Sequence, residues 1–139
     1  MADCIFCRII KGTIPCEKLY EDDRVISFLD INPASPGHTL VLPKAHFATL
    51  FDIPEEELKV CATAVQKIAR AVLSATKAPG LNLLQNNFPA AGQLVHHLHF
   101  HLIPRFHDDN LRLLPGKNHP GTGHDKILAR IRAELQATG

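Results

Sequence analysis

Residues 97–103 alternate between two chemical classes, and this alternation limits what the segment can fold into. Histidine stands at positions 97, 99 and 101, and an apolar residue follows each one. Successive side chains of an extended strand point to opposite faces of a sheet, so the pattern predicts a strand over residues 96–104. Leu98, Phe100 and Leu102 would point into a core, and the imidazoles would line the other face at steps of roughly 7 Å. Such a face favours a chemical role, because histidine titrates near neutral pH, binds metals and attacks electrophiles.

The rest of the chain is typical of short strands around one long helix. Apolar runs bounded by turn residues predict four further strands, at 18–21, 24–29, 38–42 and 81–84. From Asp52 to Pro79 an early proline, acidic residues and apolar residues at helical spacing predict the long helix. Turn-rich loops are expected at 86–93 and 108–123, and a closing amphipathic helix around Ile127 to Leu135. This order predicts an α+β fold with a mainly antiparallel sheet, packed on the long helix through one face and carrying the histidines on the other.

Composition places the chain among ordinary globular proteins. Its 139 residues are 45% hydrophobic and 21% charged, enough for one domain with a substantial core. A net charge of +1 argues against nucleic acid and anionic membranes as partners. No apolar run approaches the ~20 residues that span a bilayer. The first residues lack the pattern of a signal peptide, so we expect a cytoplasmic protein whose four cysteines are free or metal-bound.

The segment 92–105, GQLVHHLHFHLIPR, resembles the signature of the histidine triad (HIT) family. Three earlier blocks match the same family in the same order, at residues 4–12, 30–33 and 36–46. The match covers about residues 4–106, and we treat 1–139 as a single HIT domain with a C-terminal loop and helix at 107–139. The branch it resembles, the bacterial-type HIT and Hint-like proteins, implies a five-stranded sheet, one long helix and short N- and C-terminal helices. It also implies a homodimer that binds purine nucleotides, cleaves a bond at the α-phosphorus and needs no catalytic metal.

The histidines fit this chemistry. A phosphoramidate or phosphate diester is electron-rich, so a neutral imidazole nitrogen attacks it more readily than an anion does. The resemblance implies that His99 is the nucleophile and forms a covalent nucleotidyl-histidine, with a backbone carbonyl holding the proton on its other ring nitrogen. It implies that His101 and His38 donate to the nonbridging oxygens. His97 belongs to the same catalytic group, but acts only by orienting the strand if it also binds zinc.

The nucleotide-binding residues also follow from the resemblance. Asp30 would accept hydrogen bonds from both ribose hydroxyls, because a carboxylate offers two acceptor oxygens. Asn86 and the turn containing Gly92 and Gln93 would contact the phosphate, with glycine allowing a close approach. The residues that would enclose the base are Ile5, Phe6, Ile9, Phe28 and Ile31. Without the resemblance, these five would be interpreted as ordinary core.

Cys4 and Cys7 are spaced as a C-x₂-C pair, which can bind one zinc ion but needs two further ligands for a closed site. His46 and His97 match the positions that complete the site in zinc-bearing relatives. The tetrad would leave no open coordination position, so the resemblance implies a structural zinc. The alternative is a pair of partly buried thiols without metal.

We therefore predict a nucleotide hydrolase that acts on nucleoside 5′-phosphoramidates or related purine mononucleotide conjugates. Leu94 stands where phosphoramidate-specialised relatives often carry Ser or Thr, which leaves the preferred leaving group open. Two alternatives are a dinucleoside polyphosphate (Ap3A/Ap4A-type) hydrolase and a non-catalytic nucleotide-binding interaction module. A third is a catalytic metal held by His97, His99 and His101, although three such strand positions span roughly 13 Å and converge poorly on one ion.

Overall fold

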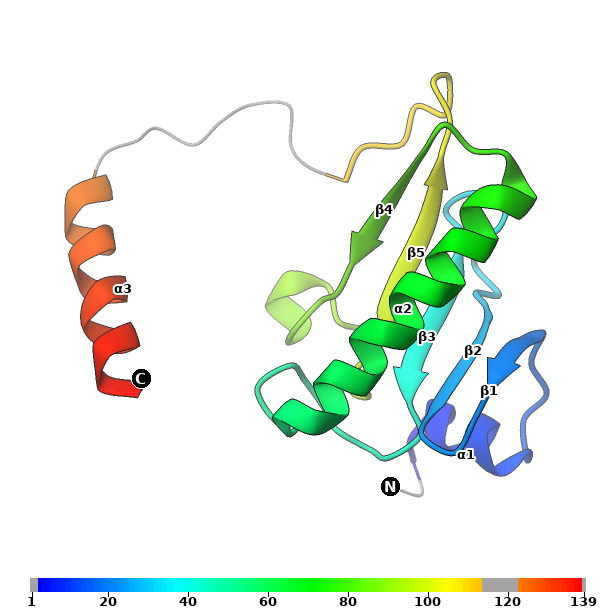
Figure 1. Ribbon diagram of the computed structural model, residues 1–139, viewed down its shortest axis with the longest axis horizontal. Helices are drawn as coiled ribbons and strands as arrows, with labels where there is room; N and C mark the ends of the chain where they lie inside the picture. The colour runs from blue at the N-terminus through cyan, green and yellow to red at the C-terminus, as the bar shows by residue number, and fades with distance from the viewer. Residues whose placement is uncertain (1–2, 114–122, 139) are drawn as a thin grey trace.

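The computed structural model describes residues 3–113 and 123–138 and contains a five-stranded sheet between two helical layers (Figure 1). The elements are α1 (Ile5–Lys11), β1 (Lys18–Glu21), β2 (Val25–Leu29), β3 (Thr39–Pro43), α2 (Glu55–Thr76), β4 (Gly80–Leu84), η1 (Pro89–Ala91), β5 (Phe100–Arg105) and α3 (His124–Thr138). The strands lie in the order β1-β2-β3-β5-β4, and each neighbouring pair is antiparallel. The predicted fold class is confirmed.

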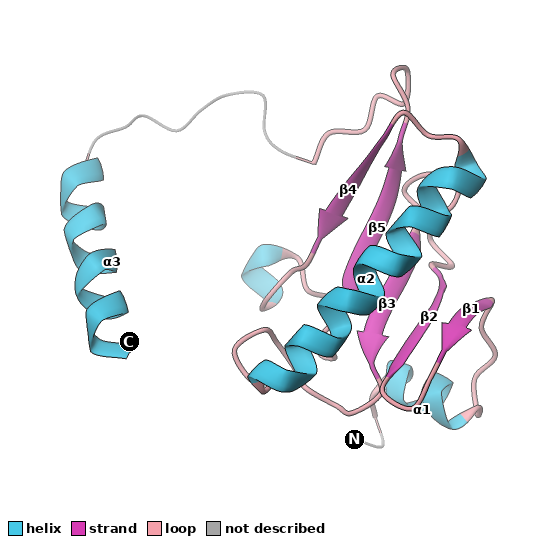
Figure 2. Cartoon of the chain, viewed as in Figure 1, coloured by secondary structure: helices cyan, strands magenta, loops and turns pink. Residues whose placement is uncertain are grey.

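The long helix α2 crosses one face of the sheet (Figure 2). Its buried residues recur at helical spacing and are Cys61, Ala64, Val65, Ile68 and Val72. Leu98 and Leu102 pack into the same cluster and are fully buried, and Phe100 packs against it, as the alternating pattern predicted. Each buried leucine contributes about 1.5–3 kcal/mol through the area it removes from water, so this layer holds α2 on the sheet.

The short helix α1 lies against the opposite face. Cys4 is its N-cap and accepts the N–H of Cys7 through Sγ at 3.4 Å, and Gly12 ends the helix with a φ of 84°. Phe6 carries α1 into a second apolar cluster with Ile26, Phe28, Leu40 and Leu42. Leu40 pairs with His101 across the sheet, and such partners share a face. His101 therefore lies on the face that α1 covers.

Two predicted boundaries differ from the structure. Strand β5 begins at Phe100 rather than at residue 96, because the chain leaves the sheet before it: the Leu98 N–H donates to the Phe47 carbonyl at 2.7 Å, outside the β3–β5 ladder. Helix α2 begins at Glu55 with Pro54 as N-cap, and the side chain of Asp52 instead accepts from the N–H and hydroxyl of Thr49.

The predicted loop at 108–123 falls largely on residues 114–122, outside the described residues. Within the part of the chain that the structure describes, no helix is both long and apolar enough to cross a membrane.

The turn that precedes β3 needs glycine for two reasons. Gly37 has a φ of +89°, and a Cβ at this position would lie 2.6 Å from Cγ2 of Thr76 at the end of α2. The turn therefore packs against α2 through bare backbone, and this contact helps to place His38, the next residue.

We expect Gly37→Ala to lower the free energy of unfolding by about 2–4 kcal/mol, from a positive φ plus a steric overlap. Gly12→Ala is the matched control, because Gly12 has a φ of +84° and nothing lies within 4 Å of its Cβ position, so it should cost only about 1–2 kcal/mol. Urea unfolding measures both. The Thr76→Ser change, which removes Cγ2, should recover part of the Gly37→Ala loss; equal losses for the two glycines would contradict the steric account.

Candidate active site and metal centre

The hydrogen bond of His99 determines which of its ring nitrogens can attack a substrate. Its Nδ1 lies 2.7 Å from the carbonyl oxygen of His97, which can only accept, so Nδ1 carries the proton. In the neutral ring the lone pair is then on Nε2. The ring is held from the side by Phe6, whose centroid lies 5.0 Å away in an edge-to-face arrangement. His99 thus has the tautomer that a nucleophile requires, and the predicted carbonyl partner is the main chain of His97.

A main-chain amide determines the tautomers of two further histidines. The N–H of Ala34 donates to Nδ1 of His38 at 3.0 Å, so the proton of neutral His38 is on Nε2. That Nε2 lies 3.0 Å from Nδ1 of His101 and 3.6 Å from Oδ2 of Asp30. His38 therefore donates to His101, and His101 carries its own proton on Nε2. We predicted that His38 donates to a phosphate; in this geometry its N–H is directed to His101 and Asp30.

Burial favours the neutral form of these rings. Loss of solvation lowers the pKa of His99 and His38, and it lowers the pKa of His101 to about 4, with smaller contributions from the neighbouring His99 and His38. Asp30 acts in the opposite direction on all three. Neutral rings keep their lone pairs at physiological pH, so the tautomers described above persist.

His97 occupies a different place from the other two triad histidines. It is completely buried; its Nε2–H donates to the Pro43 carbonyl at 2.8 Å, and its Nδ1 lies 3.5 Å from Sγ of Cys4 and 3.6 Å from Sγ of Cys7. Both ring nitrogens are therefore engaged away from His99 and His101. His97 and His99 both precede β5, yet both rings lie on the α1 side, with centroids 6.0 and 5.0 Å from that of Phe6, while Leu98 between them packs in the α2 layer.

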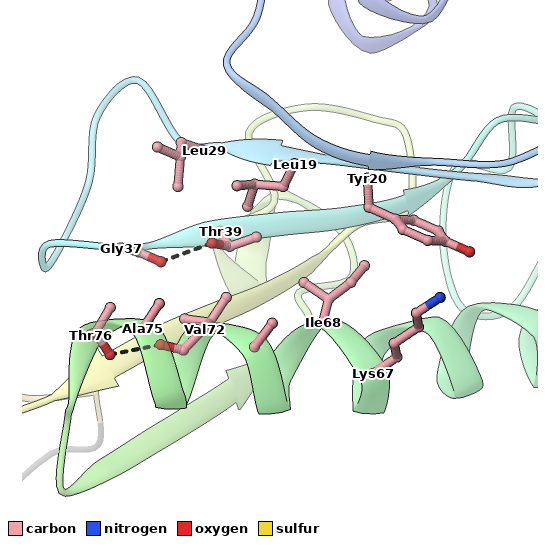
Figure 3. A pocket seen from close by; sticks show the side chains of 11 residues that line it. Leu19, Tyr20, Leu29, Gly37, Thr39, Lys67, Ile68, Val72, Ala75 and Thr76 are labelled. Atoms are coloured by element: carbon pink, nitrogen blue, oxygen red, sulfur yellow. Dashed lines mark hydrogen bonds between the residues drawn. The ribbon is translucent and has the colours of Figure 1, made fainter.

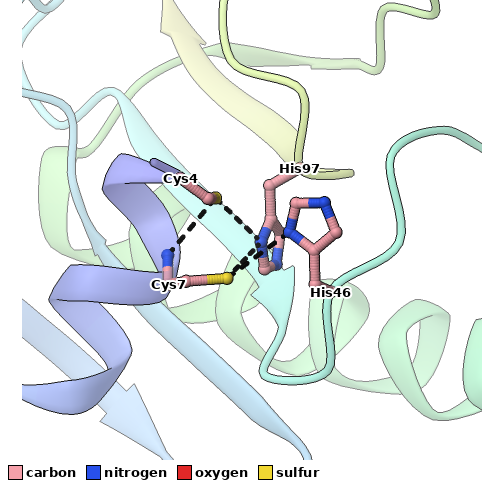
Figure 4. Close-up of side chains that lie close together, drawn as sticks. All are labelled: Cys4, Cys7, His46 and His97. Carbon is pink, nitrogen blue, oxygen red and sulfur yellow. Dashed lines mark hydrogen bonds between the residues drawn. The ribbon is translucent and has the colours of Figure 1, made fainter. Parts of the chain in front are cut away.

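Cys4, Cys7, His46 and His97 converge from three segments, as Figure 4 shows. All four ligand atoms lie within 4.8 Å of one another, and Sγ of Cys7 is 3.4 Å from Nδ1 of His46. Tetrahedral zinc with Zn–S near 2.3 Å and Zn–N near 2.05 Å places sulfur and nitrogen about 3.6 Å apart. The three sulfur–nitrogen distances, 3.4 to 3.6 Å, match this value. The tetrad therefore fits a closed zinc site.

A second group close enough to hold a metal consists of Asp30, His38 and His101. The tautomer of His38 argues against a metal there. Because Nδ1 of His38 accepts from the Ala34 amide, its Nε2 presents a hydrogen, not a lone pair, to the centre of the group. His99 belongs to neither group of the described residues, so the three triad histidines do not converge on one ion.

The predicted nucleotide-binding residues divide by exposure. Phe6 and Phe28 are buried and pack edge to face at 5.6 Å, so they form the floor beneath His99. Ile31 is 82% exposed and Ile5 is 42% exposed, while Ile9 is half-buried beside the Phe6 cluster. Asp30 accepts the N–H of Asn32 through Oδ1 at 2.9 Å and keeps Oδ2 toward His38. Among the five apolar residues, the exposed Ile5 and Ile31 are the ones that a ligand could reach most directly.

The predicted phosphate turn has its backbone amides engaged within itself. The N–H groups of Gly92 and Gln93 donate to the carbonyls of Pro89 and Phe88 at 2.9 and 3.1 Å. The buried side chain of Gln93 accepts from the Phe88 N–H at 2.7 Å and donates to the carbonyls of Ala48 and Val95, at 2.7 and 3.1 Å. Gln93 thus holds the turn, including Phe88 at a φ of 72°, and its polar groups face the protein.

Asn86 remains the polar side chain of this turn that can bind phosphate. Its side-chain amide makes no hydrogen bond to the described residues, and its Nδ2 lies 3.9 Å from the Cβ position of Gly92. Two main-chain groups that organise the site, the Ala34 amide and the Pro43 carbonyl, could not be predicted from the sequence, because such groups are not specific to a residue type.

The low pKa of His101 predicts a stability that decreases in acid. Between pH 6.5 and about 4 the unfolded chain binds a proton that folded His101 does not, so the free energy of unfolding rises with pH in this window. For this one group we expect a loss of about 2 kcal/mol between pH 7 and pH 5. Urea unfolding at the two pH values measures the loss. His101→Asn should show a smaller decrease, whereas His124→Asn, a change on exposed α3, should keep the wild-type decrease; an unchanged decrease in His101→Asn would contradict this account.

The sequence matches the HIT domain family over residues 11–108. It is 45% identical over 136 residues to adenosine 5′-monophosphoramidase HNT1 of Saccharomyces cerevisiae, covering 98% of this chain and 82% of that protein. It is 47% identical over 109 residues to adenylylsulfatase HINT3 of Arabidopsis thaliana, covering 78% of this chain and 55% of that protein. The chain thus spans about half the length of the plant relative.

Solved structures agree with the sequence relatives. The crystal structure of a HIT family protein from Bacillus subtilis superposes with a TM-score of 0.88 at 41% identity, over 97% of this chain and 96% of that one. A zinc-bound histidine triad family protein from Mycobacterium smegmatis superposes with a TM-score of 0.76 at 36% identity, over 99% of both chains. The suspected resemblance is confirmed, and this chain belongs to the HIT family.

Proposed function

We propose that this HIT protein is a nucleotide hydrolase that cleaves purine nucleoside 5′-phosphoramidates, or related mononucleotide conjugates, through a nucleotide covalently bound to His99. One observation carries the proposal: the 2.7 Å hydrogen bond from Nδ1 of His99 to the His97 carbonyl, which leaves the Nε2 lone pair available. Relatives named as an adenosine 5′-monophosphoramidase and an adenylylsulfatase support a nucleotide substrate.

The proposed role of each histidine follows from which of its ring nitrogens carries the proton. Nε2 of His99 attacks the α-phosphorus, the bond to the leaving group breaks, and water then releases the nucleoside monophosphate. Among the three triad histidines and His38, His101 is the one whose N–H is not committed to a protein acceptor, since those of His38, His97 and His99 each have one. His101 keeps its Nε2–H and donates it to a nonbridging oxygen, which stabilises the phosphoryl charge. The leaving nitrogen takes its proton from solvent, and the water that attacks in the second step gives one back to solvent. Asp30 binds the ribose hydroxyls, Asn86 contacts the phosphate, and Ile5 and Ile31 cover the base.

The zinc we propose at Cys4, Cys7, His46 and His97 is structural. When bound, it would cross-link α1, the segment after β3 and the segment before β5. It would leave no open coordination position, so no catalytic step passes through it. The zinc-bound mycobacterial relative supports a metal in proteins of this fold.

We also propose a homodimer that pairs through β4, and the two edges of the sheet support it. The β1 edge carries the charged residues Lys18 and Glu21 and an irregular register, both features that discourage strand pairing. Strand β4, with the sequence GLNLL, has no charged residue, and Leu83 is 56% exposed. An uncharged edge with an exposed leucine favours pairing with a second copy.

We expect His99→Ala to reduce turnover of an adenosine 5′-phosphoramidate at least about 10³-fold while AMP binding stays within a few fold, because the change removes the attacking nitrogen and not the ribose contacts. Intact mass after rapid quench should show nucleotidylated wild type and no adduct on the variant. His96→Ala is the matched control, since His96 is an exposed neighbour and should keep wild-type turnover.

The same assay separates the alternatives. Faster turnover of a dinucleoside tri- or tetraphosphate than of the phosphoramidate would assign the chain to that class instead. Tight binding of AMP with neither turnover nor adduct would make it a binding module.

For the metal, we expect purified protein to contain about one zinc per chain by elemental analysis, and Cys7→Ser to lose most of it with a lower melting temperature. Cys61→Ser is the control, because Cys61 lies on the buried face of α2, away from the tetrad, and burial raises the pKa of its thiol to about 11. A chelator should lower the melting temperature, while the fraction that stays folded keeps its turnover. Loss of turnover in fully folded, chelated protein would instead indicate a catalytic metal.

A further inference from the structure

The C-terminal helix α3 buries none of its side chains. Its described residues are all exposed, and it lies apart from the sheet, beyond β4 (Figure 1). Four apolar residues at helical spacing form what we call the α3 stripe: Ile127, Leu128, Ile131 and Leu135, exposed by 38% to 65%. A helix of 15 residues is marginal in water by itself, and amphipathic helices persist by packing their apolar face. The α3 stripe therefore indicates a docking surface elsewhere.

The structure contains an apolar cleft of matching length. It has a volume of about 300 Å³ and lies between α2 and strands β1 to β3, on the sheet face opposite α1. Leu19 and Leu29 line one wall and Ile68 and Val72 the other, as Figure 3 shows. We call it the α2–β1 cleft. Its α2 wall, residues 67–76, rises about 14 Å, and the α3 stripe, residues 127–135, rises about 12 Å.

One pair of opposite charges is available at the rim of the two surfaces, although α3 as a whole carries three basic and two acidic residues. Lys67 stands at one end of the α2–β1 cleft, over the ring of Tyr20 at 4.7 Å. Glu134 precedes Leu135 and flanks the α3 stripe. A helix seated in the cleft with Glu134 toward Lys67 would bring opposite charges together at the rim, where the pairing also favours one orientation of the helix.

The path of the chain after β5 leads away from its own cleft. The guanidinium of Arg105 donates to Asn82 of β4 at 2.6 Å, to both carboxylate oxygens of Asp109 at 2.8 and 3.0 Å, and to the carbonyl of Leu111. These contacts hold the departing chain beside β4, at the edge opposite β1. The superposition on the Bacillus subtilis structure covers 97% of this chain and so extends into α3. In the homodimer proposed above, the second copy would lie beyond β4, on the side toward which the chain departs.

We propose that α3 of one copy docks its stripe into the α2–β1 cleft of a second copy, so that a homodimer exchanges its C-terminal helices. The inference rests on the homodimer proposed above, and not on the hydrolase chemistry. In a pair joined through β4, the partner's β1 lies five strand spacings away, about 24 Å. The eleven residues 112–122 can span up to about 36 Å, so the tether is long enough.

Cross-linking between differently tagged chains tests the exchange. One chain carries Ala71→Cys on the α2 wall of the cleft, and the other carries Ile131→Cys on the α3 stripe. After subunit exchange and mild oxidation, non-reducing intact mass should show the disulfide-linked pair of unlike chains. The control is Ala129→Cys, on the opposite face of α3 with the same native thiols, which should give at least about tenfold less product.

Sedimentation of the unmodified protein separates the possible outcomes. A dimer with no cross-link above the control, or a doubly substituted chain that links within itself, overturns the exchange and leaves the homodimer standing. A monomer overturns both, without bearing on turnover. As a test free of cysteine chemistry, Ile131→Asp should raise the dimer dissociation constant at least about tenfold and Ala129→Asp should not; equal effects would overturn the proposal.

Discussion

The geometry of the site depends on how one buried residue, His97, is held. Its ring reaches the Pro43 carbonyl at 2.8 Å on one side and the sulfurs of Cys4 and Cys7 on the other. The main chain of the same residue supplies the carbonyl that accepts the N–H of His99 at 2.7 Å. Because ring and carbonyl belong to one residue, whatever fixes the tetrad also fixes the acceptor of the nucleophile. The hydrogen bond to Pro43 uses the ring nitrogen that does not face the cysteines, so it can hold His97 with or without a metal at the tetrad.

His38 and His101 are both neutral, so a hydrogen bond to one ring nitrogen determines that the proton is on the other. The Ala34 amide sets the proton of His38, and His38 in turn sets the proton of His101. A proton added to Nδ1 of His101 would face the N–H of His38 and break the series. The burial that lowers the pKa of His101 opposes that proton. Burial costs solvation energy, but it also keeps both rings neutral, so that each has one donor nitrogen and one acceptor nitrogen.

The sequence predicted those features that arise from local pattern. Alternation placed Leu98, Phe100 and Leu102 against the α2 layer, and helical spacing identified α2 itself, because both periods are properties of adjacent residues. The tetrad could not be found in that way: 39 residues separate Cys7 from His46, and no periodicity links them. Only the family resemblance brought these two residues together.

The errors concern places where backbone atoms, and not residue types, decide the structure. Strand β5 begins late because the Phe47 carbonyl draws the Leu98 amide out of the ladder. The turn containing Gly92 and Gln93 was predicted to contact phosphate, yet the Gln93 side chain is bonded to the Phe88 N–H and to the carbonyls of Ala48 and Val95. A buried side-chain amide needs partners for all its polar atoms, and the nearest ones were unpaired backbone groups. A sequence lists side chains, and gives no direct sign of which carbonyl or amide lacks a partner.

The order of the strands connects the chemistry to assembly. Strand β5 lies next to β4, and His101 pairs directly with Leu84, so the residue proposed to stabilise the phosphoryl charge is one strand from the uncharged edge. Pairing two copies through β4 would place their β5 strands about three spacings, or 14 Å, apart on one face of a joined sheet. A leaving group that extends past β4 would then meet the partner copy. Substrate choice would depend on residues of both chains, which explains why the nucleotide end of the substrate is easier to assign from one chain than the leaving group.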